Sequence, residues 1–179
     1  MADAREDRLR DLARRATPAV ASFLARRAYP LSNADIDDLV EEVLVVTWRR
    51  LDDIPRDAEI AWMIGVARNL LNNARRKHSR RMNAQRKLLP EGPDASAEDH
   101  VIANEQLRDA LGSLRNDDQE VLLLHYWEGL DAPALGVVLG ISAGAAATRL
   151  SRAAARLREV FAEIPESGDK ESLERTRRV

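Results

Sequence analysis

The stretch VVLGISAGAAATRLSRAAARLRE, residues 137–159, decides how the C-terminal half of the chain folds. It starts as the apolar end of a helix, turns at Gly140, and resumes as a run of alanines followed by four arginines. Glycine suits the left-handed conformation that ends a helix, and Ser142 can cap the helix that follows. The pattern therefore predicts a helix-turn-helix, with Asp131 capping its first helix and Ile141 filling the corner.

The second helix of this motif is predicted to have two different faces. Its inward face recurs at helical spacing and consists of Ala146, Leu150, Ala153 and Leu157. Its outward face carries Arg149, Arg152 and Arg156. Arginines on the second helix of such a motif can bridge guanine O6 and N7 in a DNA major groove or bind phosphates. An amphipathic helix whose arginines are merely solvated is the alternative.

Composition indicates an all-helical protein of one or two small domains. The 179 residues are 45% hydrophobic and only 4% aromatic, and Leu, Ala, Arg and Glu recur at spacings of three and four. The absence of cysteine excludes disulfides and thiolate metal sites and fits a reducing compartment. The N-terminus is too charged for a signal peptide, and no apolar stretch is long enough to span a bilayer. We expect a cytoplasmic protein without membrane insertion.

Charge is distributed in blocks along the chain. Residues 61–90 hold eight bases and no acid, and residues 142–158 hold four arginines and no acid. Residues 32–60 hold nine acids against three bases, and residues 91–105 hold five acids and no base. The two cationic blocks are compatible with nucleic-acid binding despite a net charge of −2.

The pattern predicts two helical domains joined by a flexible acidic linker. Helices are expected over about 33–51 and 57–76, and Asn116 with Gln119 is a plausible capping pair for a later one. The linker LLPEGPDASAEDH contains two prolines and a glycine. The expected divisions are an N-terminal domain at 1–87, the linker at 88–104, a C-terminal helix-turn-helix domain at 105–162, and a charged tail at 163–179.

Three segments together resemble the bacterial sigma factors of the extracytoplasmic-function (ECF) group. They are DLVEEVLVVTWRRL (38–51), AWMIGVARNLLNNARR (61–76), and the stretch from DQEVLLL to RLRE (118–159). The resemblance implies a non-enzymatic protein without cofactors that binds core RNA polymerase and directs it to promoter DNA. It also implies restraint of the free factor by domain packing or by an anti-sigma protein. A helix-turn-helix regulator that acts without being a polymerase subunit is the rival reading.

The resemblance assigns polymerase binding to the segment DLVEE. The contact candidates are Asp38, Leu39, Glu41 and Glu42, and Glu41 replaces the usual glutamine. An acidic and partly apolar helix face suits a basic helical partner. Because no histidine lies among these carboxylates, a metal site is not expected.

The resemblance assigns capture of the melted minus-ten strand to the basic stretch that follows residue 67. Asn73 matches the start of a pocket for an unstacked base. Trp48 and Trp62, by contrast, are expected to pack in the core and not to stack on bases. The predicted backbone-binding cations are Arg75, Arg76, Lys77, Arg80 and Arg81. A disordered basic loop is the alternative for this stretch.

The resemblance assigns minus-thirty-five recognition to the second helix of the helix-turn-helix. The candidates are Thr148, Arg149, Arg152 and Arg156. Ala147 stands where a base is common, so reading is expected to rest on few side chains and on DNA shape. Fully extended, the linker would span at most about 55–60 Å, comparable to about 16 base pairs at about 3.4 Å each.

Overall fold

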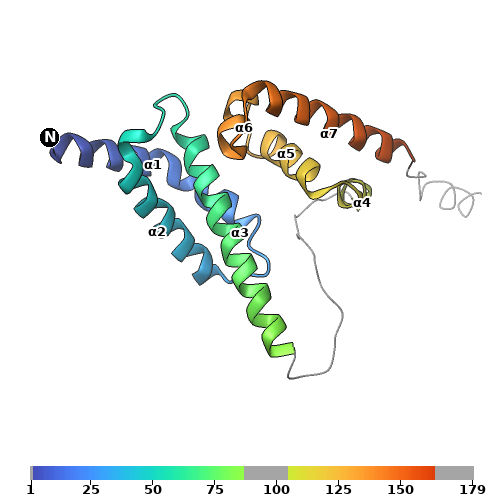
Figure 1. Ribbon diagram of the computed structural model, residues 1–179, viewed down its shortest axis with the longest axis horizontal. Coiled ribbons are helices and arrows are strands. Elements are labelled where there is room, and N and C mark those ends of the chain that lie inside the picture. The colour runs from blue at the N-terminus through green and yellow to red at the C-terminus, as the bar shows by residue number, and fades with distance from the viewer. Residues whose placement is uncertain (1, 87–104, 164–179) are drawn as a thin grey trace, which may run out of the picture.

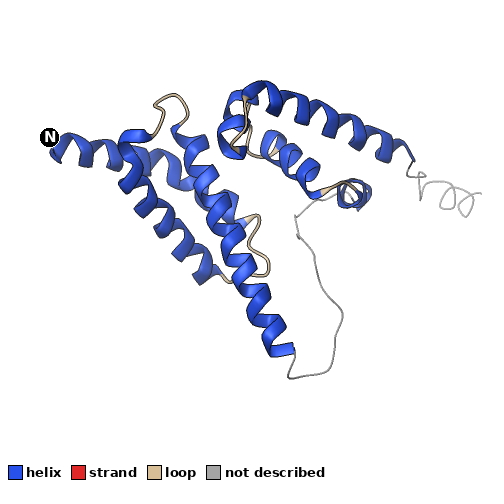
Figure 2. Ribbon diagram, in the orientation of Figure 1, coloured by secondary structure: helices blue, strands red, loops and turns tan. Residues whose placement is uncertain are grey.

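The computed structural model describes residues 2–86 and 105–163. Every regular element within those two ranges is helical, as Figure 2 shows, so the predicted all-α class is confirmed. The predicted linker at 88–104 and residues 164–179 of the predicted tail lie outside the described residues. The described helices form an N-terminal and a C-terminal bundle.

The N-terminal bundle consists of three helices and a short 3-10 turn (Figure 1). They are α1 (Ala2–Ala25), α2 (Asn33–Arg50), η1 (Leu51–Asp53) and α3 (Glu59–Arg86). Each of the three α-helices packs against the other two. The interior is filled by apolar side chains at helical spacing, among them Leu12, Ala16, Val20, Phe23, Met63, Ala67 and Leu71.

The start of α2 follows from a capping box that the sequence encodes locally. The Ser32 hydroxyl accepts a hydrogen bond from the Asp35 backbone N–H at 3.2 Å, and the Ser32 backbone N–H donates to the Asp35 carboxylate at 2.9 Å. The hydrogen bonds from the Ser32 hydroxyl and backbone lower the pKa of Asp35. Two otherwise orphaned donors are thereby satisfied at the helix end.

A buried carboxylate fastens α1 to the start of α3. Glu59 is 8% exposed, and its two oxygens lie 2.9 Å from Arg8 Nη2 and 2.8 Å from Arg15 Nη2. Burial alone would raise the pKa of Glu59, but hydrogen bonds from Arg15 and Arg8 outweigh burial and lower it. Arg8 also donates to the backbone carbonyls of Leu51 and Ile54. This cluster holds the loop between α2 and α3.

The third helix is longer than predicted, since it runs to Arg86 rather than to residue 76. The apolar periodicity on which the prediction rested fades after Ala74, because most of the residues from 75 to 84 are exposed. Their composition remains helix-favouring, with Lys, Arg, Met, Ala and Gln and no glycine or proline before Pro90. The basic stretch therefore continues as helix, and not as the loop that was the alternative.

The C-terminal bundle contains α4 (Glu105–Ser113), α5 (Asn116–Tyr126), α6 (Ala132–Leu139) and α7 (Ala143–Glu163). The predicted capping pair at its second helix is wrong. Asn116 is already helical, the cap residue Arg115 makes no side-chain capping bond, and the Gln119 side-chain amide donates to the Leu114 carbonyl at 2.9 Å. The amide is used by the preceding turn, so it is not available to close a capping box.

The two bundles contact each other directly where α3 crosses α6. The crossing is close because Gly65 has no side chain: a Cβ atom there would lie 3.4 Å from the Cα atom of Val138. Leu135 and Val138 of α6 and Ile64 of α3 are buried within one continuous apolar cluster. Nothing in the sequence pattern predicted this contact.

Within the described ranges, no single helix combines the length and the apolar composition that a bilayer crossing requires, whereas Ala132–Leu139 and Ala143–Ala162 reach those criteria only jointly, as a pair bent by 101°.

Candidate nucleic-acid and protein interfaces

The helix-turn-helix predicted from the sequence is present. The Asp131 carboxylate accepts a hydrogen bond from the Ala134 backbone N–H at 2.9 Å and caps α6. Gly140 ends α6 in the left-handed conformation, with φ of 67°. The Ser142 hydroxyl accepts from the Ala145 backbone N–H at 3.2 Å, which caps α7.

Small residues bring α6 and α7 close together. A Cβ atom at Gly136 would lie 2.8 Å from the Ile141 carbonyl oxygen, closer than any side chain tolerates. The Ile141 backbone N–H donates to the Gly136 carbonyl at 3.0 Å across the turn. Ala146 and Ala153 are fully buried on the inner face of α7, as predicted. The packed turn fixes the direction in which the outer face of α7 points.

The outer face of α7 presents a mixed set of side chains. Thr148 and Arg152 are exposed, and Arg149 is half-buried. The Thr148 hydroxyl donates to the Gly144 carbonyl at 2.9 Å, one turn earlier in the same helix. Thr148 and Arg152, four residues apart, are therefore exposed on the same face of α7.

Arg156, which the sequence placed with these DNA contacts, serves the packing of the domain. Its Nη1 atom makes a short ion pair with the carboxylate of Asp118, whose side chain is only 8% exposed. Asp118 lies in the first turn of α5, so the pair fastens α7 to α5. The Arg156 side chain itself is still 48% exposed.

The basic residues of α3 fall on two different faces of the helix. At about 3.6 residues per turn, Arg68, Asn72 and Arg75 share one face, and Asn73, Arg76 and Arg80 share another roughly 100° away. The first face is turned toward the C-terminal bundle. The second face continues beyond the N-terminal bundle into solvent (Figure 1).

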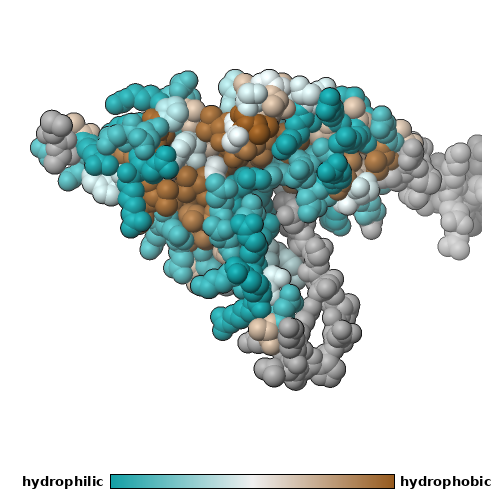
Figure 3. Space-filling model, viewed as in Figure 1, coloured by the Kyte–Doolittle hydropathy of each residue, from teal (hydrophilic) through white to brown (hydrophobic). Residues whose placement is uncertain are grey.

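The solvent face of α3 keeps its cations available. Arg76, Lys77, Arg80 and Arg81 are exposed and make no ion pair with any acid in the described part of the chain. Asn73 is exposed too, and its side-chain oxygen accepts from Arg76 Nη2 at 2.7 Å. Hydrophilic residues cover most of the protruding end of α3 in Figure 3. The C-terminal part of α3 is therefore a projecting, positively charged helix.

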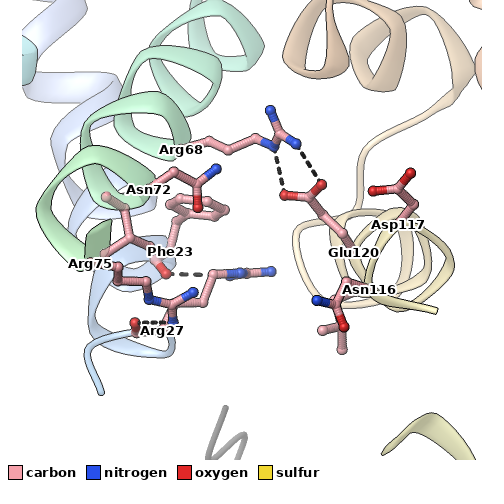
Figure 4. Close-up of a pocket in the computed structure, with 10 residues that line it drawn as sticks. Phe23, Arg27, Arg68, Asn72, Arg75, Asn116, Asp117 and Glu120 are labelled. Atoms are coloured by element: carbon pink, nitrogen blue, oxygen red, sulfur yellow. Dashed lines mark hydrogen bonds and ion pairs between the residues drawn. The ribbon is translucent and has the colours of Figure 1, made fainter. Parts of the chain in front are cut away.

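The covered face of α3 borders a cleft of about 220 Å³ between α1, α3 and α5. Arg68 Nε and Nη2 each lie 2.6 Å from one oxygen of Glu120, a bidentate pair that spans the cleft in Figure 4. The hydrogen bond to Glu120 raises the pKa of Arg68. Arg75, predicted with the strand-binding cations, points to this cleft, and its Nη2 atom donates to the Arg27 carbonyl at 2.7 Å.

A second ionic contact between the bundles involves Glu128, which lies in the turn that follows α5. Arg27 Nη1 lies 2.8 Å from one oxygen of Glu128, and Arg26 Nη2 makes a short contact with the other oxygen. The side chains of Arg27 and Glu128 are 8% and 4% exposed. Burial lowers the pKa of Arg27, and the hydrogen bond to Glu128 offsets that effect only in part.

The acidic face of α2 lies open on the N-terminal bundle. Asp38, Glu41 and Glu42 are exposed, and Val45, one turn further on, is 46% exposed. Leu39, predicted as a fourth contact, is 6% exposed and packs in the core. Its role in the structure is to hold the helix while its neighbours face outward.

The two tryptophans that were predicted to pack in the core differ in their surroundings. Trp62 is half-buried and packs against the core. Trp48 is 36% exposed, and the guanidinium of Arg5 lies 4.6 Å from the centre of its ring. The core prediction thus holds for Trp62 and only partly for Trp48.

No group of three or more His, Cys, Asp or Glu side chains in residues 2–86 and 105–163 is placed to hold a metal ion. His125 Nδ1 instead lies 2.7 Å from the carbonyl oxygen of Leu130.

Sequence reasoning missed the acids that bridge the two bundles. Glu120 pairs with an arginine 52 positions earlier, and Glu128 pairs with one 101 positions earlier. Local spacing carries no signal for pairs so far apart in the chain. Only the packing of the helices brings these groups together.

Comparison with known families accounts for both bundles. Residues 12–81 match the family model described as Sigma-70 region 2, and residues 104–157 match Sigma-70, region 4. The chain is 31% identical over 166 residues to RNA polymerase sigma factor CarQ of Myxococcus xanthus, covering 90% of this chain and 94% of the relative. It is 30% identical to ECF RNA polymerase sigma factor EcfG of Rhodopseudomonas palustris, covering 84% and 83%.

Other relatives and structures agree in fold. The chain spans only 33% of the length of the probable RNA polymerase sigma factor RfaY of Xanthomonas campestris, at 30% identity over 131 residues. It resembles the structure of CnrH in complex with the cytosolic domain of CnrY, with a TM-score of 0.54 and 25% identity over 89% of this chain and 91% of that one. The sigma factor RpoE of Bartonella quintana, solved with the anti-sigma factor NepR, has a TM-score of 0.57 at 22% identity over 86% and 96%.

The two sigma-70 regions follow one another along this chain, and the match to CarQ covers 94% of that relative. The chain therefore belongs to the ECF group of RNA polymerase sigma factors, proteins that associate with polymerase and direct promoter-specific initiation of transcription.

Proposed function

We propose that this chain binds core RNA polymerase through α2 and carries two DNA-binding surfaces, one on each domain. The proposed division places polymerase binding and minus-ten recognition in residues 1–87, a linker in 88–104, and minus-thirty-five recognition in 105–162. The chain itself performs no catalysis in this scheme, and the polymerase in the bacterial cytoplasm supplies the chemistry. The observation that carries the proposal is the pair of exposed cationic surfaces on α3 and α7, which lie on separate domains.

The proposed polymerase surface is the outer face of α2. Asp38, Glu41 and Glu42 present three carboxylates beside the exposed side chain of Val45. Charge of this kind accelerates association with a basic helix and fixes the register, and a neighbouring apolar side chain adds contact area. Leu39 contributes by keeping the helix packed, since its own side chain is buried.

The proposed minus-ten surface is the solvent face of α3. Asn73 has an amide suited to a base edge, and Arg76, Lys77, Arg80 and Arg81 can bind the phosphates of the strand that leads to it. Strand opening becomes favourable only if unstacked bases gain partners. Arg75 stands apart, because in the packed molecule its side chain is directed to Arg27.

The proposed minus-thirty-five surface is the outer face of α7. Arg152 and Thr148 are exposed on it, and Arg149 is half-buried at its edge. Arg152 can bridge a guanine, and the Thr148 methyl can contact a thymine methyl. Arg156 contributes indirectly through its pair with Asp118, which holds the helix at its angle to α5.

We also propose that an anti-sigma protein restrains this factor. The support is the likeness in fold to the sigma factor RpoE, whose structure was solved with the anti-sigma factor NepR. Affinity purification from the host, with this chain as bait, tests the proposal by identifying that protein.

The proposal is tested by reconstituted transcription. Purified chain and bacterial core polymerase are incubated with a promoter library, and start sites and strand opening are read with a single-strand probe. We expect specific start sites that depend on the chain. A chain that binds palindromic duplex tightly and ignores core polymerase would establish the rival regulator function instead.

A matched pair of variants tests the minus-ten assignment. Asn73→Ala is expected to reduce strand opening about tenfold or more while core binding stays within about twofold, because a bidentate hydrogen-bonded pair between an amide and a base edge contributes roughly 1–3 kcal/mol. Asn83→Ala, an exposed asparagine further along α3, is the control and should change neither quantity. Equal losses of opening and of core binding in Asn73→Ala would contradict the assignment.

A further inference from the structure

The projecting end of α3 holds one amine among several guanidinium groups. Lysine is rare in this protein, since only Lys77, Lys87 and Lys170 among the 28 basic residues are lysines. Lys77 is the one lysine in residues 2–86 and 105–163, and it is exposed on the part of α3 that leaves the bundle (Figure 1). A neutral amine is a nucleophile, whereas a guanidinium stays protonated and unreactive. Lys77 is therefore the exposed basic group of this helix that is open to acylation.

Helical spacing places two arginines next to this amine. Residues three and four positions apart on a helix have Cβ atoms about 5–6 Å from each other. Arg80 and Arg81 stand at these positions relative to Lys77, and all three side chains are exposed. No acid in the described part of the chain forms an ion pair with them. The Arg80 Nε atom donates to the Arg76 carbonyl at 3.2 Å, a bond that does not use its two Nη nitrogens. These donors face solvent beside the amine.

We propose that Lys77 is an acylation site whose acyl donor is a small acyl phosphate held by Arg80 and Arg81. Guanidinium groups bind phosphate oxygens through charge-assisted hydrogen bonds. In an acyl phosphate only one oxygen atom separates the carbonyl carbon from phosphorus. A phosphate held by the two arginines therefore brings that carbon to an amine one turn earlier on the helix. The inference goes beyond the proposed function, because the reaction needs neither polymerase nor promoter.

The transfer step needs only the donor and these three side chains. The neutral form of the Lys77 amine attacks the carbonyl carbon, and the carbon–nitrogen bond forms as the bond from that carbon to the phosphate oxygen breaks. Phosphate leaves with the electron pair of the broken bond, and a proton of the amine passes to water. The two guanidinium groups stabilise the negative charge that develops on the departing phosphate. The product is an uncharged amide on the side chain of residue 77.

Acylation at this position changes the charge of the solvent face of α3. The modified side chain loses its positive charge, while Arg76, Arg80 and Arg81 keep theirs because guanidinium groups do not react. Affinity for a single strand depends on the number of phosphates that cations neutralise. The modification therefore weakens strand binding by one phosphate contact and leaves the rest of the surface intact. This consequence, unlike the acylation itself, rests on the proposed function.

Incubation of the full chain with acetyl phosphate, followed by peptide mass spectrometry, tests the site. Lys170 is the internal control, because it stands between Asp169 and Glu171 in the sequence. Acetic anhydride is the reference donor, because it carries no phosphate for the arginines to hold. We expect the ratio of acetylation at Lys77 to acetylation at Lys170 to be about fivefold or more higher with acetyl phosphate than with acetic anhydride. Equal ratios with the two donors would overturn the proposal.

Matched arginine variants test how the donor is held. Arg80→Gln with Arg81→Gln should lower the rate of Lys77 acetylation by acetyl phosphate about fivefold or more, and should leave the rate with acetic anhydride within about twofold. Arg10→Gln with Arg14→Gln removes two exposed arginines of α1 and should change neither rate beyond about twofold. Both double variants change the net charge equally, so the comparison separates local phosphate binding from general attraction of an anion. Equal losses in the two double variants would overturn the role of Arg80 and Arg81.

Strand opening by the treated chain, assembled with core polymerase, measures the consequence. Acetyl phosphate treatment should lower opening by the parent chain about threefold at about 0.15 M salt, the loss expected for one phosphate contact on a single strand. Treated and untreated Lys77→Arg should open the promoter equally, because arginine is not acetylated. Selective acetylation with unchanged opening would refute the contribution of Lys77 to the minus-ten surface and would leave the acylation site established. If even the untreated parent chain opens no promoter, the proposed sigma function is what fails.

Discussion

The helices α3 and α7 both carry arginines, yet the molecule supports them in opposite ways. The last turns of α3 leave the N-terminal bundle, and their cations are exposed. In contrast, α7 packs along its length on α4, α5 and α6, and one of its arginines is tied to the buried carboxylate of Asp118. The end of α3 thus projects from its bundle with exposed cations, whereas α7 is supported along its length by neighbouring helices.

This difference matches the two forms of DNA proposed for the helices. A single strand has no rigid groove, so affinity comes from cations along a path and from partners for individual bases. A duplex groove demands a helix held at a defined angle, because a small shift moves an arginine off its base edge. A helix that projects freely suits the first task, and a helix fixed by Asp118 and Gly136 suits the second.

Matched proline substitutions test the comparison most strongly. Ser151→Pro lies in the interior of α7 and should destabilise the C-terminal domain by about 3 kcal/mol or more, since it removes a helix hydrogen bond and clashes with the preceding turn. Ser79→Pro lies in the projecting part of α3, where packing is absent, and should cost less than about 1 kcal/mol of global stability. Denaturant unfolding followed by circular dichroism measures both. Equal costs would mean that the end of α3 is supported as firmly as α7.

The support of α7 can be weakened without touching its arginines. Gly136→Ala places a Cβ atom 2.8 Å from the Ile141 carbonyl oxygen, and both are part of the tightly packed turn. We expect a loss of about 2–3 kcal/mol in the stability of the C-terminal domain through overpacking. Gly112→Ala is the control, because nothing lies within 4 Å of a Cβ atom there. A neutral Gly136→Ala would show that the turn adjusts freely.

Low pH should destabilise the packing at the start of α3, because that packing depends on the Glu59 carboxylate. Its pKa is lowered in the folded state, so its stabilising effect is fully present above the unfolded value of about 4.3 and is lost as pH falls through the lower folded pKa. Glu59→Gln should cost about 2 kcal/mol at pH 7, because it leaves Arg8 and Arg15 without their shared acceptor. The free energy of unfolding of the variant should also fall less steeply below pH 4 than that of the parent protein. Urea unfolding at several pH values measures both the loss at pH 7 and the dependence of stability on pH below 4. If the variant and the parent protein lose stability equally steeply in acid, Glu59 does not have this role.

The smallest expected effects are those of substituting Arg152 and Arg156 on α7, which should differ from each other. Arg152→Gln should weaken minus-thirty-five duplex binding about tenfold and change stability little, because the side chain is exposed. Arg156→Gln should weaken binding less than about threefold and lower domain stability by roughly 1 kcal/mol, since it leaves Asp118 unpaired. Fluorescence anisotropy at fixed salt and thermal unfolding resolve the two. The opposite result would show that Arg156 contacts DNA and that Arg152 does not.

Local sequence signals predicted much of this architecture because each depends on neighbours in the chain. The caps at Asp131 and Ser142 and the glycine turn at Gly140 are satisfied within a few residues, and each is found where it was predicted. The cap at Asn116 failed because Gln119 finds a nearer carbonyl. The end of α3 was missed because helix propensity outlasts the apolar pattern.

The residues of the candidate surfaces could be named from the sequence, whereas their surroundings could not. Spacing placed Arg152 on an outer face, and the same spacing placed Arg156 there, although a buried carboxylate 38 positions away holds it. Leu39 stands between exposed acids in the sequence and yet is buried. A helix pattern assigns a side chain to a direction, and only the neighbouring helix decides whether that direction is solvent.

Taken by itself, the sequence determined the helical class, the helix-turn-helix and the blocks of charge, since these follow from composition and from contacts within a few residues. Tertiary structure alone decided that Arg68 meets Glu120, that Arg27 meets Glu128, and that Gly65 lets α3 cross α6. The reason is physical: such contacts depend on how separate helices pack in space, and no local periodicity encodes that distance.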